Sequence, residues 1–208
     1  MVNRISEGAE AFIYGIRILG IDAVVKYRAA KRYRIAEMDK RIRSDRTKKE
    51  ARIMTAALEA GVNVPSVLFV DEYDICMSRI DGSGLNALAA SKTIAKSIFR
   101  KLGVCAGRLH NAGIAHGDYT PANVMMDSSG EPWIIDFGLS EMTGSMEDKA
   151  LDLLLMKRSI NTMQFRAFAD GYKAQGKDAA GVMKRLGEIE KRGRYQTRTL
   201  LAEDDPAD

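Results

Sequence analysis

The feature that most constrains this chain is a pair of short polar motifs in its second half. The first is His116-Gly117-Asp118, which Asn123 follows, and the second is Asp136-Phe137-Gly138. Between them lie two apolar runs around a glycine-containing turn, a pattern that predicts a β-hairpin. The side chains of Asp118, Asn123 and Asp136 carry oxygens at spacings that suit a metal–nucleotide site, because Mg²⁺ prefers a few hard oxygen ligands.

Length and composition indicate an ordinary soluble domain. The chain has 208 residues, of which 46% are hydrophobic and 29% charged, so it is long enough to bury its own core. No segment reaches the ~18 uncharged apolar residues of a membrane-spanning helix, and we expect no contact with a membrane. Cys76 and Cys105 form no CxxC pair, which favours buried, reduced thiols over a disulfide or a zinc site.

Positive charge is concentrated in one stretch. The net charge is +4, yet residues 26–52 contain twelve lysines and arginines against four acidic residues. A second basic cluster covers 184–198, and the chain ends on the acidic AEDDPAD. Clustered cations of this kind favour a phosphate-rich partner such as RNA. A solvated helix face is an equally simple interpretation.

The order of the expected elements indicates an α+β fold in two lobes. Strand patterns dominate residues 1–80 and helix patterns dominate 85–195. We therefore expect a single domain over 1–208 with a small β-rich N-lobe of about residues 1–80 and a reduced helical C-lobe of about 85–195. A flexible hinge is expected at about 77–84, where Asp81-Gly82-Ser83-Gly84 interrupts both patterns, and a C-terminal tail at 192–208.

Two residues of the N-lobe region complement the polar motifs. Lys26 lies on a predicted strand, on the same face as Val24 and Arg28. A helix is expected from a cap at Ser44 or Asp45 to Gly61, and Glu50 lies on its buried stripe. A buried carboxylate needs a partner, and Lys26 is the candidate.

These residues have distinct roles if the reaction is phosphoryl transfer, which depends on alignment and on neutralising phosphate charge. Asp136 and Asn123 would hold Mg²⁺. Asp118 would orient the attacking hydroxyl or water and accept its proton. Lys26, held by Glu50, would bind the phosphates of ATP, and Gly8, in a turn between strands, could let the backbone approach a phosphate closely.

The set resembles the protein-kinase superfamily, with a strand lysine in Val24-Val25-Lys26, an HxDxxxxN loop and a DFG motif. The resemblance implies a protein-kinase-like fold and an adenine contact at the hinge residues Met77, Ser78 and Ile80. There are departures. Gly117 replaces the usual arginine, Thr120 replaces a lysine, and Asp152 follows Gly138 by only 14 positions, with no APE motif between them. This leaves little room for a peptide-docking platform.

A closer resemblance is to the small atypical kinase/ATPase family of the KEOPS complex, also called PRPK. It covers nearly the whole chain and rests chiefly on HGDxTxxN at 116–123 and EDKAxDL at 147–153, together with SEGAE at 6–10, KxYR at 31–34 and RTxxEAR at 46–52. The resemblance implies a cytoplasmic ATPase and Ser/Thr kinase. It would act beside a threonylcarbamoyl-transferase subunit in making threonylcarbamoyl-adenosine in tRNA.

Two alternatives remain at this stage. A small-molecule phosphotransferase of the aminoglycoside/choline type also carries an HGDxxxxN loop, but it needs an extra helical insert for which this chain has little room. A non-catalytic scaffold that binds a partner protein and tRNA would explain the basic surfaces at 26–52 and 184–198.

Overall fold

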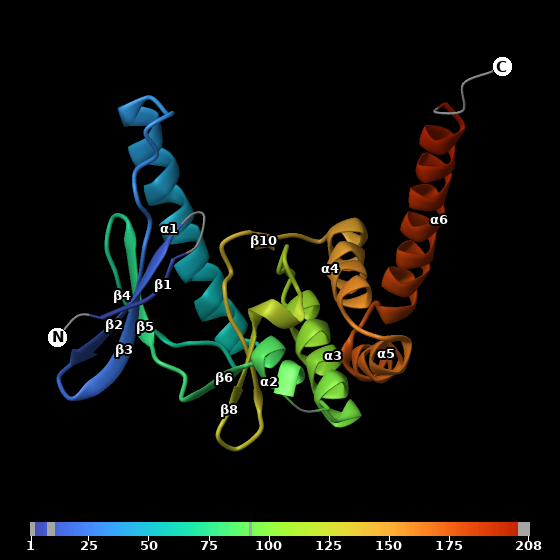
Figure 1. Cartoon of the computed structure of the whole chain (residues 1–208), viewed down its shortest axis with the longest axis horizontal. Helices are drawn as coiled ribbons and strands as arrows, with labels where there is room; N and C mark the ends of the chain where they lie inside the picture. Colours follow the sequence, from blue (N-terminus) through green and yellow to red (C-terminus); the bar gives the residue numbers. More distant parts are fainter. Residues whose placement is uncertain (1–2, 8–10, 92, 204–208) are drawn as a thin grey trace.

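The computed structural model describes residues 3–7, 11–91 and 93–203, and the side chains of the last helix as far as Arg192. Gly8, predicted to approach a phosphate, lies outside the described residues. The N-terminal part is β-rich and the rest mainly helical (Figure 1), so the predicted α+β class is confirmed.

The N-terminal part contains a five-stranded antiparallel sheet in the order β1-β2-β3-β5-β4. Its strands are β1 (Asn3–Glu7), β2 (Phe12–Ile18), β3 (Ile21–Tyr27), β4 (Val67–Val70) and β5 (Asp74–Ser78). One long helix, α1 (Ala36–Glu59), lies beside the sheet (Figure 1). Its buried Ile53 and Met54 belong to the same core as Ile75 and Met77 of β5, so burial of apolar side chains fixes the helix on the sheet.

Helix α1 begins well before the predicted cap. We expected a start at Ser44 or Asp45, but the helix already begins at Ala36. Its first turns lack an apolar stripe and are anchored by buried charges instead: Arg43 Nε donates to Asp39 Oδ2 at 2.7 Å, and Arg43 Nη1 to the Arg28 carbonyl at 3.1 Å. The Arg43 guanidinium also lies 3.7 Å from the centre of the Tyr73 ring. A hydrophobic pattern cannot reveal such an anchor.

The helices of the C-terminal part are α2 (Leu85–Ser91), α3 (Lys96–Asn111), α4 (Met146–Ser159), α5 (Thr162–Gln175) and α6 (Ala179–Glu203). Helix α3 packs against α5, and α6 packs against α4 and α5. Helices α3 and α5 approach very closely, since a Cβ added to Gly103 would meet the Phe168 carbonyl oxygen at 1.9 Å. Glycine is therefore needed where the two helices cross.

Two small sheets carry the polar motifs between these helices. The first is β6 (Gly82–Gly84), β8 (Val124–Asp127) and β9 (Pro132–Ile134), and the second is β7 (Ile114–Ala115) with β10 (Glu141–Met142). A single 3₁₀ turn, Pro121–Asn123, precedes β8. The predicted hairpin is thus β8–β9, and it separates the two motifs as expected.

Two expected boundaries differ in the structure. The end of the predicted hinge at 77–84 is strand β6, and a Cβ at Gly82 would lie 2.1 Å from the Met126 carbonyl oxygen. The small residues Gly82, Ser83 and Gly84 allow β6 to pair closely with β8, and they do not serve flexibility alone. Helix α6 continues through Glu203, into the stretch 192–208 where a C-terminal tail was predicted. No helix among the described residues is long and apolar enough to cross a membrane.

Candidate nucleotide-binding and catalytic site

A cleft of about 420 Å³ lies where the N-terminal sheet faces the β6–β8–β9 sheet. Its apolar lining includes Val24 and Met77 from one side and Met125 and Ile135 from the other. Its polar lining includes Lys26, Glu50, Asn123 and Asp136, and the predicted hinge residues Met77, Ser78 and Ile80 line it too. A mostly apolar cavity with a few converging polar groups is the usual form of a ligand site.

The hinge offers a backbone donor to a ligand. The Ser78 N–H donates to the Ser66 carbonyl at 2.9 Å and the Arg79 N–H to the Asp22 carbonyl at 3.3 Å. Within the described residues, the N–H of Ile80 has no hydrogen-bond partner. An adenine base is recognised through hydrogen bonds to its edge. The Ile80 N–H can donate such a bond whatever side chains occupy positions 78 and 79.

Lys26 connects the two halves of the cleft. Its Nζ lies 2.7 Å from Glu50 Oε1 and 2.6 Å from Asp136 Oδ1. Glu50 is 2% exposed, and its other oxygen, Oε2, accepts from Arg28 Nη2 at 2.5 Å. The predicted Lys26–Glu50 pair is therefore present, and Arg28 is a second cation on the same carboxylate. No role was predicted for Arg28, although strand alternation places it on the same face as Lys26.

Asp136 lies at the open edge of this network. Its backbone has φ of 60°, a left-handed conformation that is unusual outside glycine, and its side chain is 53% exposed. Partial burial raises the pKa of Asp136, but the adjacent Lys26 ammonium and the Gly138 N–H outweigh burial and lower the pKa below its ordinary value. Asp136 is thus an anion available to a cation at neutral pH.

Asp118 and Asn123 form a coupled pair. Asn123 Nδ2 donates to Asp118 Oδ2 at 2.8 Å and to the Asp118 carbonyl at 2.9 Å. Both bonds use the amide nitrogen, so the Asn123 amide oxygen remains available as a ligand. Asn123 lines the cleft, and Asp118 lies beyond it, half-buried.

Asp152, on α4, holds the loop at 116–118 in place. It is 1% exposed, and it accepts from the backbone N–H of His116 at 2.6 Å and of Gly117 at 2.8 Å. It also lies 3.2 Å from His110 Nε2. Sequence reasoning assigned no role to Asp152 or His110. The only available signal was the position of Asp152 inside the EDKAxDL segment.

His116 has a structural place in the loop. It is fully buried, with its ring 4.8 Å from that of Phe137 and its Nε2 3.1 Å from the Ile135 carbonyl. Burial lowers the pKa of His116, so the ring is neutral at pH 7. Nε2 then donates to the carbonyl, and Nδ1 accepts from the Asp118 N–H at 3.3 Å. The ring links the two polar motifs.

The donor set fits Mg²⁺ with nucleotide. The described residues contain no group of three His, Cys, Asp or Glu that could enclose a metal by themselves. Mg²⁺ that binds with a nucleotide needs only one or two protein carboxylates or amides, because phosphates and water supply the rest. Asp136 and Asn123, both on the cleft, meet that requirement.

Comparison with known proteins agrees with this geometry. A family model described as the RIO domain matches residues 15–171. The KEOPS complex subunit Bud32 of Pyrococcus abyssi is 36% identical over 96% of this chain and 99% of its own length. A probable serine/threonine-protein kinase BUD32 homolog of Archaeoglobus fulgidus is 41% identical over 86% of this chain and 92% of its own.

A longer relative contains a similar unit. The chain is 36% identical to part of a probable bifunctional tRNA threonylcarbamoyladenosine biosynthesis protein of Methanosphaera stadtmanae, with 91% of this chain covering 36% of that protein.

Solved structures show the same fold. The Rio2 kinase of Chaetomium thermophilum superposes over 93% of this chain and 73% of its own with a TM-score of 0.68 at 20% identity. Macrolide 2'-phosphotransferase MphH of Brachybacterium faecium superposes over 100% of this chain and 93% of its own, with a TM-score of 0.65 at 16% identity. The predicted bilobal, kinase-like fold is confirmed. The family match and the near-complete relatives together show that the chain belongs to the Bud32 family of RIO-like atypical kinases.

Proposed function

We propose that this protein is a Mg-ATP-dependent ATPase and Ser/Thr kinase that works within a KEOPS complex in the threonylcarbamoyl-adenosine modification of tRNA. The observation that carries the proposal is the charge network Lys26–Glu50–Asp136, which faces Asn123 across one cleft. The names of the relatives, a KEOPS subunit and a tRNA threonylcarbamoyladenosine biosynthesis protein, supply the biological setting.

The residues of the chain divide the work of phosphoryl transfer. Lys26 neutralises phosphate charge, and Glu50 holds it in place. Asp136 and Asn123 would hold Mg²⁺, which neutralises the phosphates when bound. Asp118, fixed by Asn123, accepts the proton of the attacking hydroxyl or water. Met77, Ser78 and Ile80 contact the adenine, and Gly8 is proposed to lie near the phosphates.

The segment after the DFG motif favours water or a partner-presented acceptor over a freely docked peptide. Residues 139–145 are the whole connection between the motif and α4, and within it Glu141 and Met142 pair with Ala115 and Ile114. This pairing holds the segment against the C-terminal half. A short, paired segment provides little surface for a peptide, so the substrate depends on the partner.

The partner we propose is a threonylcarbamoyl-transferase subunit, together with other KEOPS subunits, in the cytoplasm. A unit similar to this chain occupies about a third of the bifunctional relative, which supports a standing association between the two activities. The tRNA would contact the basic surface at 26–52, with 184–198 as a second predicted contact.

The test is modification of tRNA by a reconstituted complex that contains Asp118→Asn. The substitution preserves shape and removes the proton acceptor, so we expect modification and ATP turnover to fall together by about 10²-fold or more. Asp45→Asn is the matched control, since Asp45 is exposed on α1 and lies 3.8 Å from Arg41. Unchanged modification with Asp118→Asn would establish a scaffold instead.

A further inference from the structure

An ion pair that does not line the nucleotide cleft joins the N-terminal part of the molecule to the C-terminal part. Lys49, on α1, contacts the carboxylate of Glu141, on β10. Lys49 is the residue before Glu50 of the charge network. Glu141 pairs with Ala115 of β7, and Ala115 is the residue before the loop at 116–118. The ion pair therefore links both sides of the candidate site.

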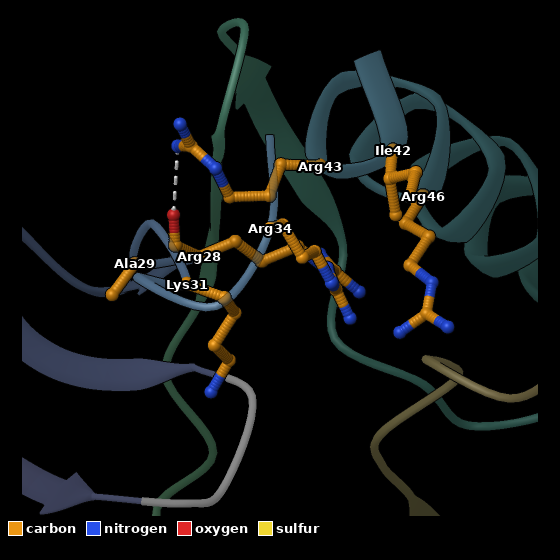
Figure 2. Close-up of a pocket in the computed structure, with 7 residues that line it drawn as sticks. All are labelled: Arg28, Ala29, Lys31, Arg34, Ile42, Arg43 and Arg46. Carbon is orange, nitrogen blue, oxygen red and sulfur yellow. Dashed lines mark hydrogen bonds between the residues drawn. The ribbon is translucent and has the colours of Figure 1, made fainter. Parts of the chain in front are cut away.

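Helix α1 and the N-terminal sheet form one unit. Arg43, on α1, donates to the Arg28 carbonyl at 3.1 Å (Figure 2), and Arg28 in turn donates to Glu50 at 2.5 Å. Ile53 of α1 and Ile75 of β5 belong to the same buried core. Because the sheet and the helix are joined in this way, a contact between α1 and β10 fixes the position of the whole unit against the C-terminal part.

A second attachment of this unit lies just beyond the other end of α1. The Ile134 N–H donates to the Asn63 carbonyl at 2.9 Å, and Asn63 Nδ2 donates to the Pro132 carbonyl at 3.3 Å. Lys49 precedes Glu59, the last residue of α1, by about 15 Å of helix. A rotation of about 10° around the attachment at Asn63 would therefore displace Lys49 by about 2–3 Å, which is enough to break a hydrogen bond.

A further ion pair crosses the cleft, but the nucleotide competes for it. Lys26 Nζ lies 2.6 Å from Asp136 Oδ1. In the proposed function these two groups separate, because Lys26 binds phosphate and Asp136 binds Mg²⁺. The Lys49–Glu141 pair lies off the cleft lining, so the nucleotide does not compete for it. It can hold the two parts together while Mg-ATP is bound.

We propose that Lys49 and Glu141 are positioning residues, whose ion pair keeps the two sides of the cleft at their working distance once Mg-ATP has occupied it. This inference rests on the proposed function. The two side chains are 41% and 62% exposed, and an exposed ion pair adds little to the stability of a fold. The effect of the pair therefore belongs in kcat and not in thermal unfolding.

The experiment measures steady-state ATP turnover by the full chain, without tRNA, over a range of Mg-ATP concentrations. For Lys49→Gln and for Glu141→Gln we expect kcat to fall about fivefold to tenfold while KM changes less than about twofold, because the pair aligns the bound nucleotide without touching it. Lys48→Gln is the matched control. It removes the same charge from the exposed neighbouring position on α1, where the side chain makes no interaction within the described residues. Single variants with the kcat of this control would overturn the proposal.

Charge reversal tests whether the two residues act through each other. The double variant Lys49→Glu/Glu141→Lys again places opposite charges on α1 and β10, so we expect its kcat to lie within about threefold of the parent, well above that of Lys49→Glu alone. A double variant as slow as Lys49→Glu would contradict the proposal. Thermal unfolding is recorded for every variant, and losses of kcat that follow losses of melting temperature would show a merely structural role and overturn it.

Failure of this inference can be told from failure of the proposed function. If Asp136→Asn abolishes turnover while the Lys49 and Glu141 variants match the Lys48→Gln control, the positioning role fails and the proposed function stands. If Asp136→Asn turns over ATP like the parent, the proposed function fails and the positioning role fails with it.

Discussion

The two halves of the candidate site are held in place by different physical means. On the N-terminal side, Lys26, Arg28 and Glu50 are fixed by mutual charge, with few hydrogen bonds to the backbone. On the C-terminal side, the loop at 116–118 is fixed by its own backbone, through N–H groups that donate to the buried Asp152. Charge holds Lys26, and a hydrogen-bonded backbone holds the loop that carries Asp118.

Because of this difference, a mutation on one side should reduce activity, whereas a mutation on the other should reduce stability. A mutation at the half-exposed Asp136 of the charge network removes a functional group but leaves the sheet and α1 packed by their apolar core. A mutation under the loop leaves buried N–H groups without an acceptor and so destabilises the fold itself.

The largest effect is expected at Asp152. Asp152→Ala removes the acceptor of two backbone N–H groups and the neighbour of His110. We expect the free energy of unfolding to fall by about 3–5 kcal/mol, the scale of a broken buried charge interaction. Urea unfolding measures it, with Asp170→Ala, an exposed aspartate on α5, as control. A stability equal to that of the control would contradict the role of Asp152.

A smaller effect, on activity more than stability, is expected at Glu50. Glu50→Gln weakens the hold on both Lys26 and Arg28, so kcat/KM for ATP should fall about 10²-fold, which corresponds to about 2.7 kcal/mol. Steady-state ATP turnover is the measurement. Glu59→Gln, exposed near the end of the same helix, is the control and should behave like the parent. Were Glu50→Gln to match it, the charge network would have no catalytic role.

The smallest effect is a pH dependence at His116. Burial lowers the pKa of His116 below the ordinary value of 6.5, although Asp152 acts in the opposite direction. The unfolded chain therefore binds the proton more readily, so stability decreases as pH falls below about 6.5, by at most about 1.4 kcal/mol per pH unit. Between pH 7 and 5.5, the melting temperature of His116→Gln should fall less with decreasing pH than that of the parent. Identical slopes would mean that His116 does not contribute.

Much of the site could be predicted because its residues lie in short, specific motifs. Spacing pointed to Asp118, Asn123 and Asp136, and the structure places Asn123 and Asp136 on one cleft with Asp118 bonded to Asn123. The hairpin between the motifs formed as expected. The Lys26–Glu50 pair followed from strand alternation and from the rule that a buried carboxylate needs a partner. Local patterns suffice where a residue's neighbours in sequence determine its place.

The supporting residues could not be predicted because their partners are distant in sequence. Asp152 supports a loop 35 residues away from it in sequence, and no periodicity marks such a contact. Helix α1 began early because Asp39 and Arg43 form a buried ion pair, which neither a phosphate-rich partner nor a solvated helix face would have predicted. Gly82 looked like part of a flexible hinge, although it is needed for close strand pairing. Each of these depends on tertiary packing.

We propose that Asp136, beside Lys26, is the anion around which Mg-ATP is used. The most direct test is Mg²⁺-dependent ATP turnover by the parent and by Asp136→Asn, which keeps the shape of the side chain and removes its charge. We expect turnover to fall at least about 10²-fold in the variant, while its thermal unfolding stays close to that of the parent. Equal turnover by the two proteins would contradict the claim.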